Sequence, residues 1–176
     1  MRRHLLVTND FPPKVGGIQS YLWELWRRLP AGDVAVYTTP YPGATDFDRN
    51  QGFALERSPE RVLLPYPWLP GRINRLAVRH DADLVVWDPA VPLGLTAPHV
   101  DRPYAVVLHG SEVTVPGRLP VTRALLVRVL DRASLVICAG QYPAGEAERA
   151  VGRPLPTVVV PPGVDVRRFV PLDKGE

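Results

Sequence analysis

Short apolar runs alternate with segments of helical periodicity along nearly the whole chain, and this alternation constrains the fold more than any other feature. An apolar run without polar alternation is typical of a strand buried on both faces of a parallel sheet. Connections between such strands are right-handed and place helices on both faces. We therefore predict an α/β fold, a Rossmann-like, doubly wound and mostly parallel sheet with helices on both faces. Strands are predicted over residues 5–8, 33–39, 84–87, 104–108, 135–139 and 157–160, with further candidates at 53–57 and 61–64, and helices over 18–29, 69–80, 92–97, 119–130 and 142–151.

The segments that follow the predicted strands are the natural place for a ligand. In a doubly wound sheet, ligands bind outside the carboxyl ends of the strands. Segments 9–17, 88–92, 109–113 and 140–141 should therefore converge on one cleft.

Size and composition limit the functional classes. A chain of 176 residues with 45% hydrophobic content is long enough for one well-buried domain. The net charge of +3 is mild, and we find no dense basic stripe with interleaved aromatic residues, so nucleic-acid binding is not expected. Cys138 is the only cysteine and lies in an apolar run, which predicts a buried, inert thiol. Without a recognisable signal peptide or membrane-spanning stretch, we expect a soluble, cytoplasmic protein.

A glycine-bearing loop connects the first predicted strand to the first helix. Gly16 and Gly17 allow a ligand to approach the backbone, and the following helix offers N–H groups and the positive end of its dipole to phosphate. The loop matches neither the dinucleotide fingerprint nor the Walker loop. The glycine pair either cradles a diphosphate or forms a tight turn. Asp10 either accepts hydrogen bonds from a sugar or polyol hydroxyl or closes an Asx-type turn, and Gln19 points either into the cleft or to solvent.

A second polar cluster follows the strand predicted at 104–108. His109 stands at the strand end and is followed by Gly110, Ser111 and Glu112. A neutral imidazole there could donate to a substrate hydroxyl or a reacting sugar, with Glu112 orienting it or bonding the acceptor. The alternative is a capped strand end at which Ser111 or Glu112 starts the next turn.

A basic amphipathic stretch follows three closely spaced prolines. Trp68, Arg72, Arg75 and Arg79 could lie on an anionic bilayer or hold a lipid phosphate. The alternative is a surface helix whose apolar side packs on the sheet while its arginines are solvated. The four histidines show no metal-ligand spacing, so no metal site is predicted.

Taken together, these residues resemble the N-terminal half of a GT-B glycosyltransferase of family 4. The first three of the matching motifs are most similar to phosphatidylinositol mannosyltransferases of the actinobacterial type. The motifs are Asn9-Asp10-Phe11-Pro12-Pro13 with Gly16-Gly17-Ile18-Gln19-Ser20-Tyr21-Leu22, Val62-Leu63-Leu64-Pro65, Pro92-Leu93-Gly94-Leu95 with Ala97-Pro98, His109-Gly110-Ser111-Glu112, and Val160-Pro161-Pro162-Gly163-Val164-Asp165 with Arg168-Phe169.

The resemblance implies an acceptor-binding domain over residues 1–165, with 166–176 starting an interdomain linker or tail. It implies retaining transfer of a hexose such as mannose, without a metal or other cofactor, from a nucleotide sugar such as GDP-mannose to a lipid or polyol acceptor such as a phosphatidylinositol mannoside. Gly16 and Gly17 would face the donor diphosphate, and His109 would lie beside the transferred sugar. Asp10 would share the catalytic site, and Gln19 would face the acceptor with residues 110–112.

The same resemblance implies that most of the donor is held by a C-terminal Rossmann-like domain that these residues do not include. The chain alone is then expected to be inactive and to contact the inner face of the plasma membrane peripherally. Two other functions stay open. The chain could be a non-catalytic phosphate- or nucleotide-binding module, on the strength of the glycine loop alone. It could also be a membrane- or partner-docking module built on residues 68–79.

Overall fold

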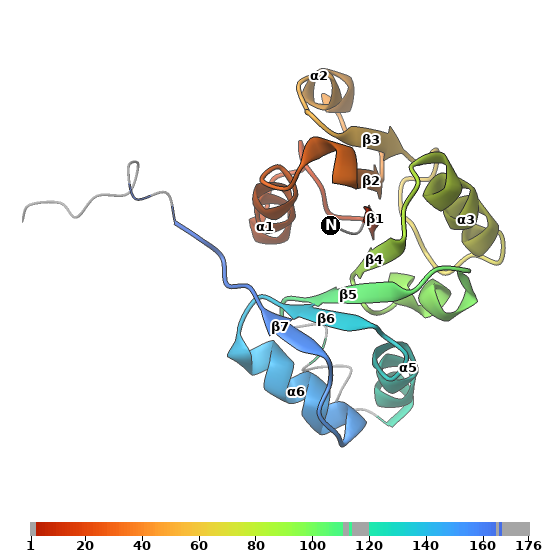
Figure 1. Cartoon of the computed structure of the whole chain (residues 1–176), viewed down its shortest axis with the longest axis vertical. Coiled ribbons are helices and arrows are strands. Elements are labelled where there is room, and N and C mark those ends of the chain that lie inside the picture. Colours follow the sequence, from red (N-terminus) through yellow and green to blue (C-terminus); the bar gives the residue numbers. More distant parts are fainter. Residues whose placement is uncertain (1–2, 111–112, 114–119, 165, 167–176) are drawn as a thin grey trace, which may run out of the picture.

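The structure, a computed structural model, describes residues 3–110, 113, 120–164 and 166. Within these residues the strands form one parallel sheet (Figure 1). Its seven strands stand in the order β3-β2-β1-β4-β5-β6-β7, and every neighbouring pair is parallel. This confirms the predicted fold class. The strands are β1 (His4–Thr8), β2 (Val34–Thr38), β3 (Ala54–Arg57), β4 (Leu84–Asp88), β5 (Tyr104–Leu108), β6 (Leu135–Cys138) and β7 (Thr157–Val159).

Helices cover both faces of the sheet because successive side chains of a strand point to opposite faces. In β1, Leu6 packs in one core with Leu22 and Trp26, while Leu5 packs in the other core with Ile73. Figure 1 accordingly places α1 and α3 on opposite sides of the sheet. The α-helices are α1 (Gly17–Trp26), α2 (Ala44–Arg49), α3 (Leu69–Arg79), α5 (Pro120–Leu130) and α6 (Gln141–Val151), and the 3₁₀ helices are η1 (Ala31–Asp33) and η2 (Leu93–His99).

The strand order reverses direction at β1. The chain runs outward through β2 and β3, then returns to place β4 on the other side of β1. Thr8 and Asp88, the last residues of β1 and β4, are therefore register partners. Connections leave in opposite directions at such a switch point, which opens a crevice at the carboxyl edge of the sheet.

One predicted strand is wrong. Residues 61–64 do not join the sheet. The side chain of Asn9 instead satisfies both backbone groups of Leu63: its Nδ2 donates to the Leu63 carbonyl at 2.8 Å, and its Oδ1 accepts from the Leu63 amide at 2.7 Å. Because these groups are already paired and the Leu63 side chain is buried, the segment is anchored without a strand partner.

Smaller differences concern helices. The segment predicted as a short helix at 92–97 is the 3₁₀ helix η2, and the first helix ends at Trp26 rather than at residue 29. Helix α2 was not predicted, since Pro40, Pro42 and Gly43 indicate only a turn. Residue 119, at the predicted start of the next helix, lies outside the described residues. Within the described ranges, no helix has the length and apolarity needed to cross a bilayer. Cys138 is buried, as expected.

Candidate functional site

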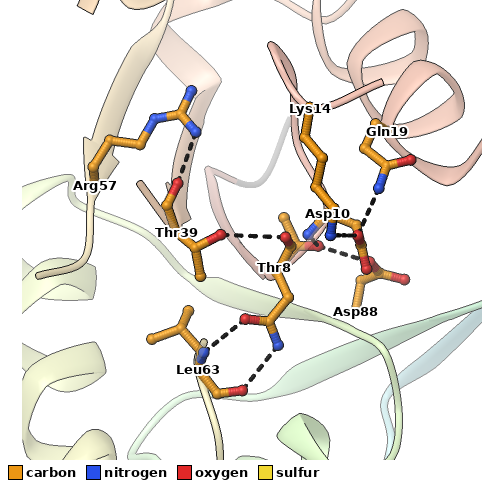
Figure 2. Close-up of polar contacts among 9 residues, drawn as sticks. Thr8, Asp10, Lys14, Gln19, Thr39, Arg57, Leu63 and Asp88 are labelled. Atoms are coloured by element: carbon orange, nitrogen blue, oxygen red, sulfur yellow. Dashed lines mark hydrogen bonds and ion pairs between the residues drawn. The ribbon is translucent and has the colours of Figure 1, made fainter. Parts of the chain in front are cut away.

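The loop after β1 is held by side chains that reach across it. Oδ1 of Asp10 accepts hydrogen bonds from Lys14 Nζ and from Gln19 Nε2, each at 2.6 Å (Figure 2). The Asp10 amide donates to Thr8 Oγ1 at 2.9 Å. In the bonds among the described residues, the Asp10 carboxylate is thus engaged by side chains rather than by an Asx-type turn. It lies half-buried with a positive charge beside it, and it remains a candidate partner for a hydroxyl.

The two glycines of the loop have different reasons to be glycine. A Cβ on Gly16 would lie 2.1 Å from Gln19 Oε1, so the side chain of Gln19 occupies the space beside Gly16. A Cβ on Gly17 would have no heavy atom within 4 Å. Gly17 opens helix α1, whose first N–H groups lack partners within the helix. The backbone is therefore open to a ligand at Gly17, while Gly16 makes room for Gln19.

The ends of β4 and β5 contribute a buried acid and a histidine. Oδ1 of Asp88 lies 2.8 Å from His109 Nε2, and Oδ2 accepts from Thr8 Oγ1 at 2.7 Å. Only 1% of the Asp88 side chain is exposed, against 12% for His109. Burial raises the pKa of the Asp88 carboxyl, while the hydrogen bonds from His109 and Thr8 oppose that rise. The role of Asp88 was not predicted, since it lies at the end of an apolar run and its partners are distant in sequence.

Tyr21 of α1 forms an aromatic wall beside this pair. Its ring meets the His109 ring edge to face, with centroids 5.3 Å apart. Its hydroxyl donates to the Val160 carbonyl at 2.8 Å. Burial raises the pKa of the Tyr21 phenol, with smaller effects from Cys138 and Asp88. Tyr21 occurs within a matching motif of the sequence, but no role was predicted for it.

The predicted convergence of the first loop and His109 on one rim is confirmed. A continuous hydrogen-bond chain runs from the Asp10 amide through Thr8 and Asp88 to His109. Gly110 follows with φ of +142°, a conformation that favours glycine. Segment 140–141 starts α6 at the same sheet edge. Ser111 and Glu112, both predicted acceptor-binding residues, lie outside the described residues.

The residues predicted to hold a lipid phosphate do not lie at this rim but beside β2 and β3. Four arginines line a pocket of about 280 Å³, which we call the arginine pocket. Arg72 is fixed by Tyr37 Oη at 2.9 Å and Glu60 Oε2 at 2.7 Å, and its guanidinium lies 4.4 Å from the Trp68 ring centroid. The lining residues are Tyr37, Glu56, Arg57, Pro59, Arg72, Arg75, Leu76 and Arg79.

The arginine pocket touches the first loop through Arg57 alone among its lining arginines. Arg57 donates to the Pro12 and Thr39 carbonyls and pairs with Asp48. Arg79 pairs with Glu56 at 2.9 Å. Among the described residues, Arg75 has no ion pair or hydrogen bond, so it is the lining cation that the fold leaves uncompensated. The buried residues Leu69, Ile73, Leu76 and Ala77 confirm that the apolar side of α3 packs on the sheet.

No group of three potential metal-ligating side chains occurs within the ranges that the structure describes. The rim offers instead backbone N–H groups at α1, a half-buried carboxylate with an amide beside it, and an imidazole held by a buried acid. This donor and acceptor set fits a polyhydroxylated ligand bearing phosphate.

Comparison with known proteins gives the family. Residues 15–168 match glycosyltransferase family 4. The chain is 40% identical over 181 residues to a GDP-mannose-dependent alpha-(1-6)-phosphatidylinositol monomannoside mannosyltransferase of Mycobacterium tuberculosis, covering 97% of this chain and 47% of the relative. It is 30% identical to the enzyme of Corynebacterium glutamicum that is described as acting on the monoacylated monomannoside, with 97% and 46% covered.

A solved structure shares the fold. The UDP complex of HepE from Anabaena superposes with a TM-score of 0.68 at 20% identity, covering 94% of this chain and 45% of that one. The chain thus spans about half the length of the curated relatives it matches. The matched residues include the first loop from Val15 onward and, from the hydrogen-bond chain at the switch point, Asp88 and His109. This chain belongs to glycosyltransferase family 4.

Proposed function

We propose that this chain is the acceptor-binding domain of a retaining, metal-independent mannosyltransferase that uses GDP-mannose and a phosphatidylinositol mannoside. The observation that carries the proposal is the hydrogen-bond chain that joins the Asp10 loop to His109 at the switch point. The names of the relatives supply the donor and the acceptor class. In this proposal, residues 1–165 form the domain, 166–176 begin a linker, and a C-terminal Rossmann-like domain binds most of the donor.

Each rim residue has a role in this proposal. The backbone of Gly16 and Gly17 faces the donor diphosphate, because helix N-termini favour anions and Gly17 leaves its surroundings open. His109 lies beside the transferred sugar. The Asp10 carboxylate and the Gln19 amide, joined by their mutual hydrogen bond, are assigned to hydroxyls of the acceptor, and Gly110, Ser111 and Glu112 are assigned to the same ligand.

Titration of the ¹⁵N-labelled chain tests this function. We expect the deacylated headgroup of phosphatidylinositol monomannoside to bind weakly and to shift amides of residues 9–19 and 109–110. GDP-mannose should bind more weakly still, and the chain alone should transfer no mannose. Asp10→Asn should weaken headgroup binding, because a carboxylate that accepts from hydroxyls is replaced by an amide. Asp46→Asn, on exposed helix α2, is the matched control.

Two outcomes would contradict the proposal. If the headgroup shifts no amide near residues 9–19, the acceptor role is wrong. If GDP-mannose binds tightly while the headgroup does not bind, the alternative of a non-catalytic phosphate- or nucleotide-binding module is favoured.

A second proposal concerns the surface around the arginine pocket, which we assign to an anionic bilayer at the inner face of the plasma membrane. Val62 and Leu64 are exposed, and Trp68 is 42% exposed. Tyr66 stacks on Trp68 with centroids 4.9 Å apart. The Arg72 guanidinium lies over the Trp68 ring, and aromatic rings beside arginine are suited to the boundary between headgroups and acyl chains.

Vesicle co-sedimentation tests the bilayer contact. Binding to vesicles of phosphatidylcholine with phosphatidylinositol should exceed binding to phosphatidylcholine alone, and it should weaken with salt. Arg75→Gln should reduce it, while Arg128→Gln on α5 should not. Binding that persists after Arg72, Arg75 and Arg79 are all neutralised would contradict this electrostatic account.

A further inference from the structure

Asp88 is an acid that the fold buries at the carboxyl edge of the sheet, with 1% of its side chain exposed. Burying a carboxylate is unfavourable unless donors surround it. Both oxygens of Asp88 are engaged, Oδ1 with His109 Nε2 at 2.8 Å and Oδ2 with Thr8 Oγ1 at 2.7 Å. An apolar residue at this strand end would avoid the penalty, so the acid requires an explanation beyond packing.

The directions of these hydrogen bonds follow from counting protons. A threonine hydroxyl has one proton to donate and lone pairs with which to accept. The Asp10 amide can only donate, so Thr8 Oγ1 accepts from it and turns its own proton to Asp88 Oδ2. With Oδ2 receiving that proton, a carboxylate at Asp88 accepts the second one from His109 Nε2. Thr8 and Asp88 are register partners on adjacent strands, so this arrangement is fixed by the sheet itself.

We propose that Asp88 is a positioning residue for His109, and that Thr8 holds Asp88 in the orientation this requires. Asp88 keeps the Nε2–H form of the imidazole and stabilises its protonated form, and it thereby sets which ring nitrogen is presented to groups other than Asp88. The proposal rests on the proposed function for the statement that His109 lies beside the transferred sugar. It also makes the Asp10 loop and His109 one unit, because the Thr8 hydroxyl and the Asp88 carboxylate connect them.

Other titratable groups lie near Asp88 and His109 and can affect their protonation. Among the described residues, they include Tyr21 from α1 and Asp10 from the first loop, and Cys138 from β6 acts in turn on Tyr21. Tyr21 contacts the His109 ring through its edge-to-face packing and bonds through its hydroxyl to Val160, so it shapes the site without replacing the acid.

Two-bond ¹H–¹⁵N correlation spectra of the chain labelled with ¹⁵N-histidine test the proposal. The neutral ring of His109 should show the Nε2–H pattern. In Asp88→Asn the side chain keeps its size but loses its charge, so the midpoint of the His109 titration should fall by about one pH unit or more. His80, which pairs with Glu56 at 2.6 Å, is an internal control whose signals should not move. An Nδ1–H pattern in the parent, or an unchanged midpoint in Asp88→Asn, would overturn the proposal.

Substitutions at Thr8 keep the test decisive if Asp88→Asn does not fold. Thr8→Ser retains the hydroxyl and should leave the His109 ring signals as in the parent. Thr8→Val retains the shape without the hydroxyl and should shift them. Equal spectra for Thr8→Ser and Thr8→Val would overturn the role of Thr8.

A ligand arm separates this proposal from the proposed function. Deacylated headgroup added to the parent should perturb the His109 ring signals. If it does not, while Asp88→Asn still shifts the midpoint, the positioning role stands and the sugar-transfer site is wrong. If the headgroup perturbs the ring but Asp88→Asn leaves the midpoint unchanged, the site stands and the positioning role is wrong.

Discussion

The switch-point rim and the arginine pocket both gather charged side chains, but they are built in opposite ways. At the rim, a buried acid is bonded to Thr8 at the end of β1 and to His109 just after β5, with 1% of its side chain exposed. At the arginine pocket, the Arg79–Glu56 pair stands in solvent, and 64% of the Arg79 side chain is exposed. Buried polar networks lose much when one member is removed, whereas exposed ion pairs contribute little. The network at the rim should therefore contribute much to the stability of the fold, whereas the exposed Arg79–Glu56 pair should change with little effect on stability.

The sharpest test of this contrast compares two acids. Asp88→Ala leaves the Thr8 hydroxyl and His109 Nε2 without their partner, so we expect the free energy of unfolding to fall by about 3 kcal/mol. Glu56→Ala, which removes the partner of Arg79 and His80, should lower it by less than about 1 kcal/mol. Urea unfolding measures both values. Equal losses would contradict the contrast.

A second comparison uses two asparagines that each make two hydrogen bonds. Asn9→Ala removes both bonds to Leu63, and we expect a loss of about 2 kcal/mol with faster hydrogen exchange at the Leu63 amide. Asn74 makes two exposed bonds to Asp101, so Asn74→Ala should cost less than about 1 kcal/mol. A larger loss in the free energy of unfolding for Asn74→Ala than for Asn9→Ala would contradict this expectation.

The glycine pair gives a smaller effect within the rim. Gly16→Ala should displace Gln19 from Asp10 and lower the free energy of unfolding by about 1 kcal/mol, because the new Cβ occupies the position of Gln19 Oε1. The loss should largely disappear in the Gln19→Ala background, where nothing is left to displace. Gly17→Ala is the control, and no loss is expected there. Additive effects of Gly16→Ala and Gln19→Ala would contradict this explanation.

The smallest effect is a difference in pH response. Burial raises the pKa of Glu60, but the hydrogen bonds from Ser58 and Arg72 together outweigh it and hold the pKa of Glu60 below its ordinary 4.5. Glu60 therefore stabilises the fold above that value, and the contribution is lost as the pH falls through its lower folded pKa. The stability difference between the parent and Glu60→Gln should shrink on acidification.

Asp88 should respond with the opposite sign. Burial raises its pKa above the ordinary 3.8, so its contribution is present below that value and is lost as the pH rises through the folded pKa. The parent should lose stability relative to Asp88→Asn over that rise. Unfolding curves between pH 3 and pH 7 measure both trends, and trends of the same sign at the two positions would refute the distinction.

The sequence was sufficient for the sheet and for the location of the rim. Apolar runs and helical periods identify the strands because burial on both faces leaves a local pattern, and parallel strands bring residues 9–17 and His109 to one edge. The strand predicted at 61–64 was wrong because this segment is held by a contact that is distant in sequence. The partner of Leu63 is the side chain of Asn9, 54 residues away, and no local pattern reports such a bond.

The role of Asp88 was missed for a related reason. Its pairing with Thr8 follows from the register of β1 and β4, which depends on the strand order rather than on either segment alone. Tyr21 likewise acts through a ring contact between α1 and the end of β5. Residues that act by positioning a residue distant in sequence are not marked by a local sequence pattern.

The bond from Tyr21 to Val160 has a mechanical consequence. It ties the first α-helix to the backbone just after the last strand, across 139 positions of the chain. The Tyr21 ring whose hydroxyl donates this hydrogen bond also packs against the imidazole of His109. A displacement of the segment after β7 would therefore break this hydrogen bond or rotate the Tyr21 ring. Rotation of that ring would change its contact with His109.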